Sequence, residues 1–453
     1  MLLVSTYELG RQPFGIASPA AWLREAGIDV TCADVSREKL PDAAVAAADV
    51  IGFYLPMHTA TRLALPLIDR ARQLNPTARI GAFGLYAQLN QHLLRRRGVE
   101  AIFGGEFEEA LTAWVQACRA AGGSSGLRSR ASGVSRVRFK VPDRAGLPSL
   151  TRYAALQLPD GSRRVTGYTE ASRGCKHFCR HCPIVPVYEG RFRVVPVDVV
   201  IADARAQIDA GARHITFGDP DFFNGIRHAI DVVTAFAREF TGVSYDATIK
   251  IEHLLKHADA LPVLSRTGCL LVTSAVESVD EGILQKLRKG HTRADVERAL
   301  SLCRRAGLTL APTFVPFTPW TTIDGYADLL DEIERLTLVS SVAPIQLALR
   351  LLITSGSRLL ELPDVQSVTG DFDPESLSYP WRHPDPRVDA LQRRIEQIVD
   401  RGVVVSRSVN GRREETFARI RGAVDEALEV APRERPPLVA RAAVPYLTEP
   451  WYC

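Results

Sequence analysis

The N-terminal part of the chain alternates short apolar runs with amphipathic stretches. Apolar runs occur at 1–6 (MLLVST), 48–56 (ADVIGFYLP), 78–84 (ARIGAFG) and 99–105 (VEAIFGG). Helical patterns separate these runs, as at 59–74 (TATRLALPLIDRARQL). This alternation predicts βαβ units and a parallel, doubly wound sheet, in which ligands bind beyond the carboxyl ends of the strands.

The pattern fades over 119–166, where Gly, Ser, Arg and Pro predict a linker with some ordered segments. Alternation then resumes, and further strands are expected at 214–219, 243–251, 270–277, 308–317 and 345–353. Six strand–helix repeats predict a partial (β/α)6 barrel of the TIM type, with functional residues at the carboxyl ends of its strands. In the run TIKIEH, the spacing of Lys250 and Glu252 predicts that they share one face of a strand.

The fold class expected from these patterns is α/β. The last part of the chain has helical patterns and a Pro-rich tail that ends YLTEPWYC. We therefore predict a doubly wound N-terminal domain (1–118), a linker (119–166), a partial barrel (167–358) and a small helical C-terminal region with a Cys-ending tail (359–453).

Composition and charge narrow the range of functions. Hydrophobic residues make up 46% of the 453 residues and charged residues 24%, as in globular proteins. No apolar run reaches the roughly 18 residues of a membrane helix, and the N-terminus lacks a signal-peptide pattern. The net charge of +4 is small, and the densest basic run, 126–140, lies in the predicted linker. We expect a cytoplasmic protein that binds neither a membrane nor a nucleic acid.

Three of the eight cysteines stand close together in SRGCKHFCRHCP, where Cys175, Cys179 and Cys182 are spaced C-x3-C-x2-C. The other five are dispersed, unlike a secreted disulfide framework. Three thiolates this close can bind three corners of a [4Fe–4S] cluster and leave the fourth iron open. The competing interpretation is a structural zinc site with His177 or His181 as the fourth ligand, although the three-residue spacing fits zinc poorly.

This motif, placed after the first barrel strand, resembles the signature of the radical S-adenosylmethionine (radical SAM) superfamily. The resemblance covers about 167–358, and the preceding domain looks like the cobalamin-binding domain that many of these enzymes carry. It implies that the open iron binds the amino and carboxylate groups of SAM. An electron from the cluster, supplied by a reductant such as a flavodoxin or ferredoxin, would break a C–S bond of SAM. The resulting carbon radical would act on a small-molecule substrate.

The same resemblance suggests which residues contact SAM. The candidates near the predicted strand ends are His181, Gly218, Asp219, Glu277, Ser278 and Arg350. His181 stands where an aromatic residue usually contacts adenine, and the backbone of 218–219 stands where the SAM amino group is bound. Residues 277–278 resemble groups that hold the ribose or carboxylate. Arg350 is a candidate partner of the SAM carboxylate, with a salt bridge at the barrel mouth as the alternative for Asp219 and Arg350.

The resemblance leaves open whether cobalamin binds. The familiar fingerprint D-x-H-x-x-G supplies a histidine to the cobalt, whereas this chain has TYELGRQPFG (6–15) after its first strand, with neither the Asp nor the His. Binding without a protein histidine and loss of the cofactor are both compatible with this loop. His58 follows a later strand, so it is a candidate pocket residue or a helix cap and not the motif histidine.

The final residues resemble the tail of one radical SAM subfamily, which ends in Cys-Cys-Ala-Glu-Pro or carries selenocysteine at the second cysteine (CUAEP/CCAEP tail). The resemblance implies that a UGA codon is read as stop after Cys453 and that this cysteine belongs to a thiol–selenol pair. Such a pair is a soft ligand for trivalent arsenic. Cys453 would then hold the acceptor when a 3-amino-3-carboxypropyl group of SAM is transferred to arsenic.

Three functions follow as alternatives. The first is a radical SAM transferase that moves a SAM-derived group to a soft acceptor held by the tail. The second is a cobalamin-dependent radical SAM methyltransferase of secondary metabolism. The third is a redox or iron sensor with a structural cluster, which would need a fourth protein ligand that the sequence does not show.

Overall fold

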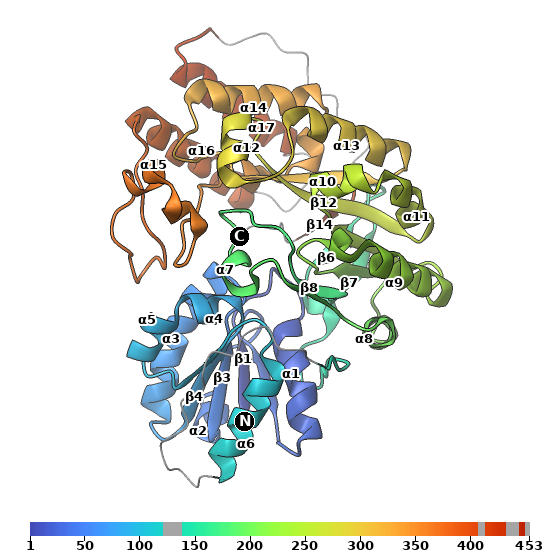
Figure 1. Ribbon diagram of the computed structural model, residues 1–453, viewed down its shortest axis with the longest axis vertical. Coiled ribbons are helices and arrows are strands. Elements are labelled where there is room, and N and C mark those ends of the chain that lie inside the picture. The colour runs from blue at the N-terminus through green and yellow to red at the C-terminus, as the bar shows by residue number, and fades with distance from the viewer. Residues whose placement is uncertain (121–137, 406–412, 432–443, 449–453) are drawn as a thin grey trace.

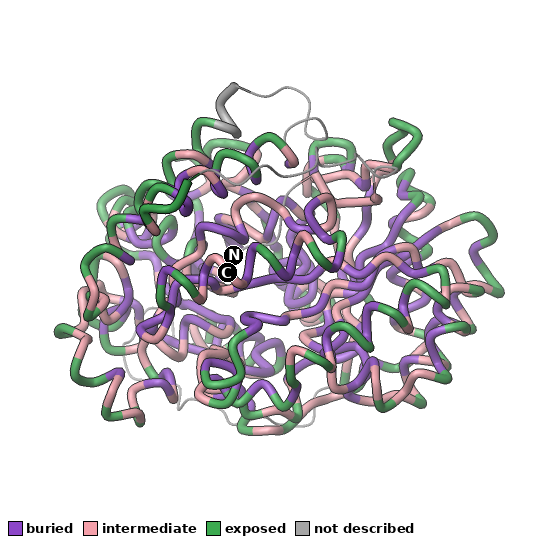
Figure 2. The backbone as a smooth tube through the Cα atoms, turned by 90° about the horizontal axis from the view of Figure 1, so that it is seen from above, coloured by how far each residue is buried: buried purple, intermediate pink, exposed green. Residues whose placement is uncertain are grey.

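The structure is a computed structural model that describes residues 1–120, 138–405, 413–431 and 444–448. Two α/β halves are stacked along the long axis, with the N-terminal half at the bottom of the view (Figure 1). Seen from above, buried positions concentrate in the interior and exposed positions lie along the outer helices (Figure 2). None of the described helices combines the length and the apolar character that a membrane span requires.

The N-terminal half is built on a parallel sheet in the order β2-β1-β3-β4-β5. Its strands are β1 (Leu2–Ser5), β2 (Thr31–Asp34), β3 (Val50–Tyr54), β4 (Arg79–Phe83) and β5 (Ala101–Phe103). One face packs against α1 (Phe14–Glu25) and α6 (Glu108–Ala120). The other face packs against α2 (Asp42–Ala46), α3 (His58–Leu74), α4 (Leu85–Leu89) and α5 (Gln91–Arg96). Helices on both faces explain why the strands are continuous apolar runs, and the predicted doubly wound sheet is confirmed.

The second half contains a curled sheet in the order β13-β12-β11-β10-β7-β6-β14. The parallel strands are β7 (Arg163–Thr169), β10 (His214–Phe217), β11 (Ser244–Thr248), β12 (Cys269–Glu277) and β13 (Thr309–Phe314). At one edge, β6 (Ala155–Gln157) pairs antiparallel with both β7 and the tail strand β14 (Tyr446–Leu447). The predicted partial barrel is confirmed.

One large apolar core lies between this sheet and its outer helices. These helices are α8 (Val197–Asp209), α9 (Ile226–Glu239), α10 (Ile251–Lys256), α11 (Leu261–Arg266), α13 (Arg293–Arg305), α14 (Ile323–Arg335), α16 (Pro386–Val405) and α17 (Arg413–Ala427). A smaller core joins α12 (Glu281–Leu287) to α15 (Pro363–Gln366). The predicted helical C-terminal region is therefore present, and it packs directly on the barrel.

The strand predicted at 345–353 is wrong. This segment begins with a 3-10 turn (Pro344–Leu347), and beyond the end of β13 it forms only an isolated parallel bridge between Phe317 and Arg350. The side chain of Gln346 explains the difference, because its Oε1 accepts a hydrogen bond from the backbone N–H of Phe314 (3.1 Å). That N–H, in the last residue of β13, is thus bonded to a side chain instead of to a sixth strand.

The predicted strand alternation of Lys250 and Glu252 is also wrong. The strand β11 ends at Thr248, Lys250 caps α10, and Glu252 lies in the first turn of that helix. The two side chains still pair, with Nζ of Lys250 3.1 Å from Oε2 of Glu252. The run TIKIEH is ambiguous by pattern because it spans the end of a strand and the start of a helix.

Three short elements lie at the boundary between the halves: β8 (Ser172–Gly174), α7 (Val185–Tyr188) and β9 (Phe192–Val194). The strands β8 and β9 form an antiparallel ribbon, and α7 packs against α4 of the N-terminal half (Figure 1).

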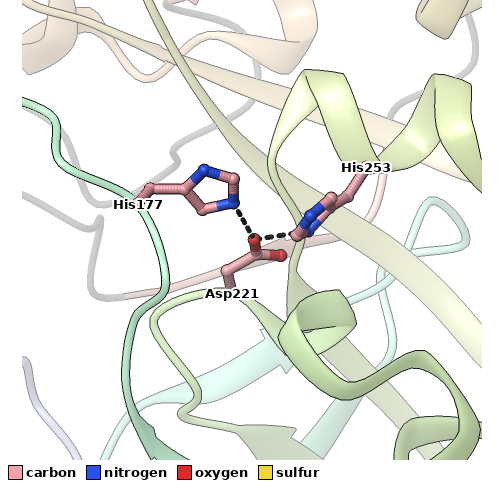
Figure 3. A group of neighbouring side chains, drawn as sticks. All are labelled: His177, Asp221 and His253. Atoms are coloured by element: carbon pink, nitrogen blue, oxygen red, sulfur yellow. Dashed lines mark ion pairs between the residues drawn. The ribbon is translucent and has the colours of Figure 1, made fainter. Parts of the chain in front are cut away.

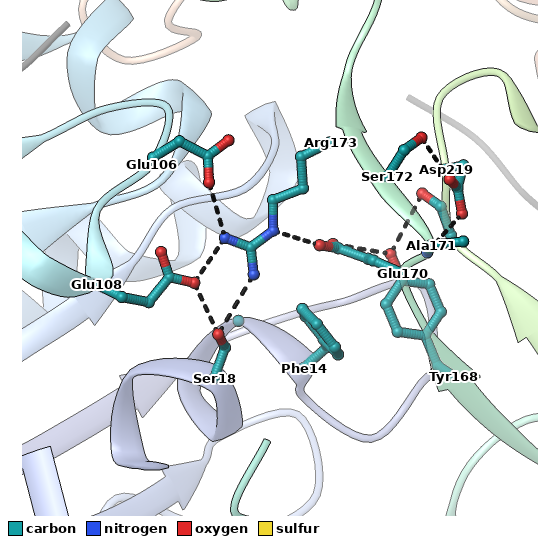
Figure 4. A network of polar contacts seen from close by, with 12 residues as sticks. Phe14, Ser18, Glu106, Glu108, Tyr168, Glu170, Ala171, Ser172, Arg173 and Asp219 are labelled. Carbon is teal, nitrogen blue, oxygen red and sulfur yellow. Dashed lines mark hydrogen bonds and ion pairs between the residues drawn. The ribbon is translucent and has the colours of Figure 1, made fainter. Parts of the chain in front are cut away.

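A buried ionic network joins the two halves (Figure 4). Arg173 of β8 donates to Oε1 of Glu108 (2.6 Å), to Oε2 of Glu106 (3.3 Å) and to Oε2 of Glu170 (2.6 Å). Glu106 and Glu108 belong to the N-terminal half and are 1% exposed. One guanidinium therefore compensates three carboxylates that water cannot reach freely, and its loss would leave them unpaired.

We expect Arg173→Met to lower the free energy of unfolding by about 3–5 kcal/mol, because the three carboxylates would lose the guanidinium that pairs with all of them. The measurement is urea denaturation. The control is Arg70→Met, which removes an ion pair with Asp42 that is about half exposed on both sides and should cost less than about 1 kcal/mol. Equal losses in the two variants would contradict the role of Arg173.

Candidate functional site

The three-cysteine loop lies at the carboxyl ends of the barrel strands, next to the N-terminal half. Cys175 follows β8 directly, and two residues separate Cys182 from the start of α7. The turn into the loop needs a glycine, because Gly174 has a φ of +77° and a Cβ there would lie 2.5 Å from the carbonyl oxygen of Arg191. The geometry of the loop is thus set by its first residue.

Neighbouring side chains and backbone groups hold the loop in place. Oδ1 of Asn224 accepts a hydrogen bond from the N–H of Lys176 (3.3 Å) and lies 3.9 Å from Sγ of Cys175. Further along, the N–H of Arg180 donates to the carbonyl oxygen of Leu287 (3.0 Å) at the end of α12. The loop is therefore anchored from two sides of the barrel mouth.

The donor set fits an iron–sulfur cluster with three protein ligands. The three cysteines form no disulfide, and the other described cysteines lie elsewhere, in the N-terminal half or in the barrel core. A buried cation, Lys289, faces the loop. Burial would lower the pKa of Lys289, but Glu277 and the thiols of Cys179 and Cys182 raise it above its usual value. The positive charge of Lys289 can therefore compensate the negative charge of thiolate ligands in the loop.

His181 and Glu277 are brought together by the fold. Nε2 of His181 lies 3.2 Å from Oε1 of Glu277, and the same oxygen lies 3.3 Å from Nζ of Lys289. Burial alone would raise the pKa of Glu277, yet Lys289 and His181 lower it to about 2. Glu277 also has a left-handed backbone, with a φ of +70°, which is unusual for a non-glycine residue. Glu277 thus combines a strained backbone at the end of β12 with an ionised carboxylate that faces His181 of the cysteine loop.

The side chain of Asp219 is buried and makes hydrogen bonds within the protein. Its carboxylate accepts hydrogen bonds from the backbone N–H of Ala171 (3.0 Å) and from the hydroxyl of Ser172 (Figure 4). Gly218 has no room for a side chain, because a Cβ would lie 1.9 Å from the hydroxyl oxygen of Tyr168. The backbone of 218–219 as a SAM contact stays a prediction, while the Asp219 carboxylate holds the segment that leads into β8.

The remaining candidates are placed as follows. The hydroxyl of Ser278 accepts a hydrogen bond from the N–H of Asp280 (3.1 Å). Arg350 donates to Oδ1 of Asp389 (2.6 Å) and to the carbonyl oxygen of Trp381 (2.7 Å), and its guanidinium lies 3.5 Å from the centre of the Trp381 ring. The guanidinium of Arg350 is thus engaged by the C-terminal region, as in the salt-bridge alternative, and its contact with SAM stays a prediction.

Cys453 lies outside the described residues, so its role stays a prediction. The tail is described up to 448, and β14 together with Val444 and Pro445 borders a cavity on the inner side of β12 and β13. Arg413 also lines this cavity, with its guanidinium 4.7 Å from the Tyr446 ring. Because β14 and β7 both run antiparallel to β6, the tail strand points in the same direction as β7.

Sequence reasoning missed Lys289 and Asn224. Lys289 stands in LRKGHTR after α12, and no motif or period marks it. Asn224 stands in the quoted segment FGDPDFFNG, but a lone amide gives no signal of its target. Both reach the cysteine loop only because parallel strands bring their carboxyl ends to one side of the barrel.

The models of two protein families match the chain: the B12 binding domain over residues 2–115 and the radical SAM superfamily over residues 169–333. A hopanoid C-3 methylase of Methylococcus capsulatus is 26% identical over 151 residues, which is 33% of this chain and 29% of that protein. A tRNA-2-methylthio-N(6)-dimethylallyladenosine synthase of Chlorobium luteolum is 25% identical over 185 residues, which is 37% of this chain and 39% of that protein. The chain thus spans less than half of these curated relatives.

Two solved structures have the same architecture. OxsB, a cobalamin-dependent SAM radical enzyme with aqua-cobalamin bound, matches with a TM-score of 0.72 and 14% identity over 94% of this chain and 71% of that chain. The methyltransferase TsrM from Kitasatospora setae, with tryptophan and a SAM analogue bound, matches with a TM-score of 0.56 and 18% identity over 74% and 71%. The chain thus combines an N-terminal region that matches the B12 binding domain with a region that matches the radical SAM superfamily.

The loop after β1, at the upper edge of the N-terminal sheet, carries no histidine. Its acid is the half-buried Glu8, whose Oε2 accepts hydrogen bonds from the N–H groups of Phe14 (3.0 Å) and Gly15 (3.2 Å). His58 starts α3, and its Nε2 is bonded to the carbonyl oxygen of Ser376.

Each of Cys175→Ala, Cys179→Ala and Cys182→Ala is expected to abolish cluster binding, because a three-ligand site has no protein ligand to spare. The measurement is bound iron and the visible absorption of the anaerobically reconstituted protein. The matched control is Cys303→Ala, whose thiol is fully buried in the barrel core and whose loss should leave the cluster intact. Retention of full iron by a loop variant would refute the assignment.

Proposed function

We propose that this enzyme cleaves SAM reductively at the three-cysteine loop and transfers a SAM-derived group to a small molecule. The observation that carries the proposal is a loop with three cysteines that form no disulfide and no fourth cysteine nearby among the described residues, facing the buried Lys289. When bound, a [4Fe–4S] cluster with one open iron supplies the electron that breaks a C–S bond of SAM. The reductant would be a small electron carrier such as a flavodoxin or ferredoxin.

The chain itself positions and shields the site. Gly174 and Asn224 set the path of the loop, and Lys289 compensates its negative charge. The ion pair of Glu277 with His181 and Lys289 fixes the end of β12 beside the loop. The N-terminal half covers this side of the barrel, with its helix α4 packed against α7 next to the cysteine loop. This cover limits the access of water to a reactive radical.

For the transferred group, methyl transfer assisted by cobalamin is the candidate that the comparisons favour. The B12-binding match covers most of the N-terminal half, and OxsB shares the architecture of nearly the whole chain. Relatives named as a methylase and as methylthiotransferases also move one-carbon or sulfur-containing groups. The acceptor would be a small molecule of secondary metabolism.

Transfer of the aminocarboxypropyl group is the second candidate. It is supported by the direction of the tail: β14 lies beside the inner side of the barrel and points the same way as β7, toward the end of the sheet that carries the cysteine loop. In this candidate Cys453 holds a soft acceptor such as trivalent arsenic.

Identification of the SAM fragments distinguishes the two candidates. The reconstituted enzyme is incubated anaerobically with SAM and dithionite, and the products are analysed by mass spectrometry. Methyl transfer predicts S-adenosylhomocysteine together with 5′-deoxyadenosine, whereas aminocarboxypropyl transfer predicts methylthioadenosine. Cys179→Ala should give none of these products. Absence of SAM cleavage by the intact, cluster-loaded enzyme would disprove the proposed function.

If a corrinoid binds, we expect it to bind without a histidine ligand, because the loop after β1 carries no histidine and its acid, Glu8, is bonded to the N–H groups of Phe14 and Gly15. The measurement is the electron paramagnetic resonance spectrum of cob(II)alamin bound to the protein, which should lack splitting from an imidazole nitrogen. His58→Ala should leave the spectrum unchanged. Imidazole splitting that His58→Ala removes would contradict the expectation, and failure to bind any corrinoid would exclude the cobalamin-dependent candidate.

A further inference from the structure

A second group of potential ligands stands beside the cysteine loop and has no part in the proposed chemistry. It consists of His177, in the loop itself, Asp221, just after β10, and His253, in α10 after β11 (Figure 3). One ligand atom from each residue lies within 4.8 Å of the others. Three different segments thus converge on one point at the barrel mouth.

The contacts within this group are short. Oδ2 of Asp221 lies 3.3 Å from Nε2 of His177 and 2.7 Å from Nδ1 of His253. Yet none of these three atoms makes a hydrogen bond of acceptable geometry, although each is shielded from solvent. Asp221 is 3% exposed and His253 is 7% exposed. Buried polar atoms normally have hydrogen-bond partners, so three adjacent exceptions require an explanation.

A bound cation explains the arrangement. Two imidazole nitrogens and one carboxylate oxygen form a ligand set typical of divalent transition metals, and the ligands must present lone pairs to the ion instead of N–H groups to each other. The other oxygen of Asp221, Oδ1, is oriented by the N–H groups of Phe223 (3.3 Å) and Lys250 (3.4 Å). This leaves Oδ2 to face the two rings.

Lys250 and Glu252 lie behind the His177 ring. Nδ1 of His177 lies 3.1 Å from Nζ of Lys250 and 3.8 Å from Oε2 of Glu252. A ligating Nε2 requires a proton on Nδ1, so on metal binding Nδ1–H would have to face the Glu252 carboxylate and not the ammonium of Lys250, which can only donate. The charge of Lys250 is balanced by Glu252, whose carboxylate lies 3.1 Å from it.

We propose that His177, Asp221 and His253 bind one divalent transition-metal ion of the zinc type, separate from the iron–sulfur cluster. The ion would tie the cysteine loop to the carboxyl ends of β10 and β11. Because His177 lies between Cys175 and Cys179, this tie would add to the hydrogen bonds by which Asn224 and Leu287 hold Lys176 and Arg180 of the cluster loop.

Zinc is the probe, and the protein is used with its cluster intact so that the cysteines are already occupied. After dialysis against Zn²⁺ and removal of loosely bound metal, zinc and iron are measured in the same sample. We expect stoichiometric zinc in the unaltered chain. In Asp221→Asn and His253→Gln, zinc should fall by more than about tenfold, since even outer partners contribute that much to affinity, while iron and cluster absorption are retained.

The matched control is His257→Gln. This histidine follows α10, its ring lies 5.8 Å from that of His253, and it is not a member of the group. It should retain zinc. X-ray absorption at the zinc edge of the unaltered protein gives an independent test, with imidazole nitrogens at about 2.0–2.1 Å and no sulfur at about 2.3 Å. A sulfur shell, or full zinc in Asp221→Asn, would overturn the proposal.

Discussion

The arrangement of the molecule depends on one buried guanidinium. Arg173 faces three carboxylates, two of them from the N-terminal half, and a charge of this kind is tolerated in the interior only when its partners are all in place. The same residue lies two positions before Cys175, in the short strand β8. The contact between the halves and the start of the cysteine loop are therefore fixed by the same short strand, so neither can shift without the other.

Much of the fold could be predicted because it follows from local periodicity. Parallel strands covered on both faces give apolar runs such as MLLVST and HITFGD, and amphipathic helices separate them. The absence of a sixth barrel strand at 345–353 could not be predicted, since the side chain of Gln346 accepts a hydrogen bond from the N–H of Phe314 and no sequence pattern indicates that contact. The prediction that TIKIEH continues a strand was wrong for a related reason. The alternation of apolar and polar residues over so short a segment fits the end of a strand and the start of a helix equally well.

In the candidate site, too, residues close in sequence could be predicted, whereas residues that the fold brings together could not. Cys175, Cys179 and Cys182 could be proposed as ligands because three ligands of one cluster need close sequence spacing. Lys289, Asp221 and His253 are brought together by the convergence of separate strand ends, and such convergence leaves no trace in spacing. For Asp219 the SAM contact of the backbone stays a prediction, whereas the hydrogen bonds to Ala171 and Ser172 show what its carboxylate does.

The pairing of β14 with β6 has a consequence for the whole chain. A strand at the edge of a sheet exposes unpaired N–H and C=O groups, which attract strands of other molecules. Here residues near the C-terminus cover that edge, with Tyr446 and Leu447 aligned on Gln157 and Leu156. Since residues 446–447 follow all the other strands of this sheet in sequence, the barrel edge stays uncovered until they have been synthesised, and it closes after the rest of the sheet has been made.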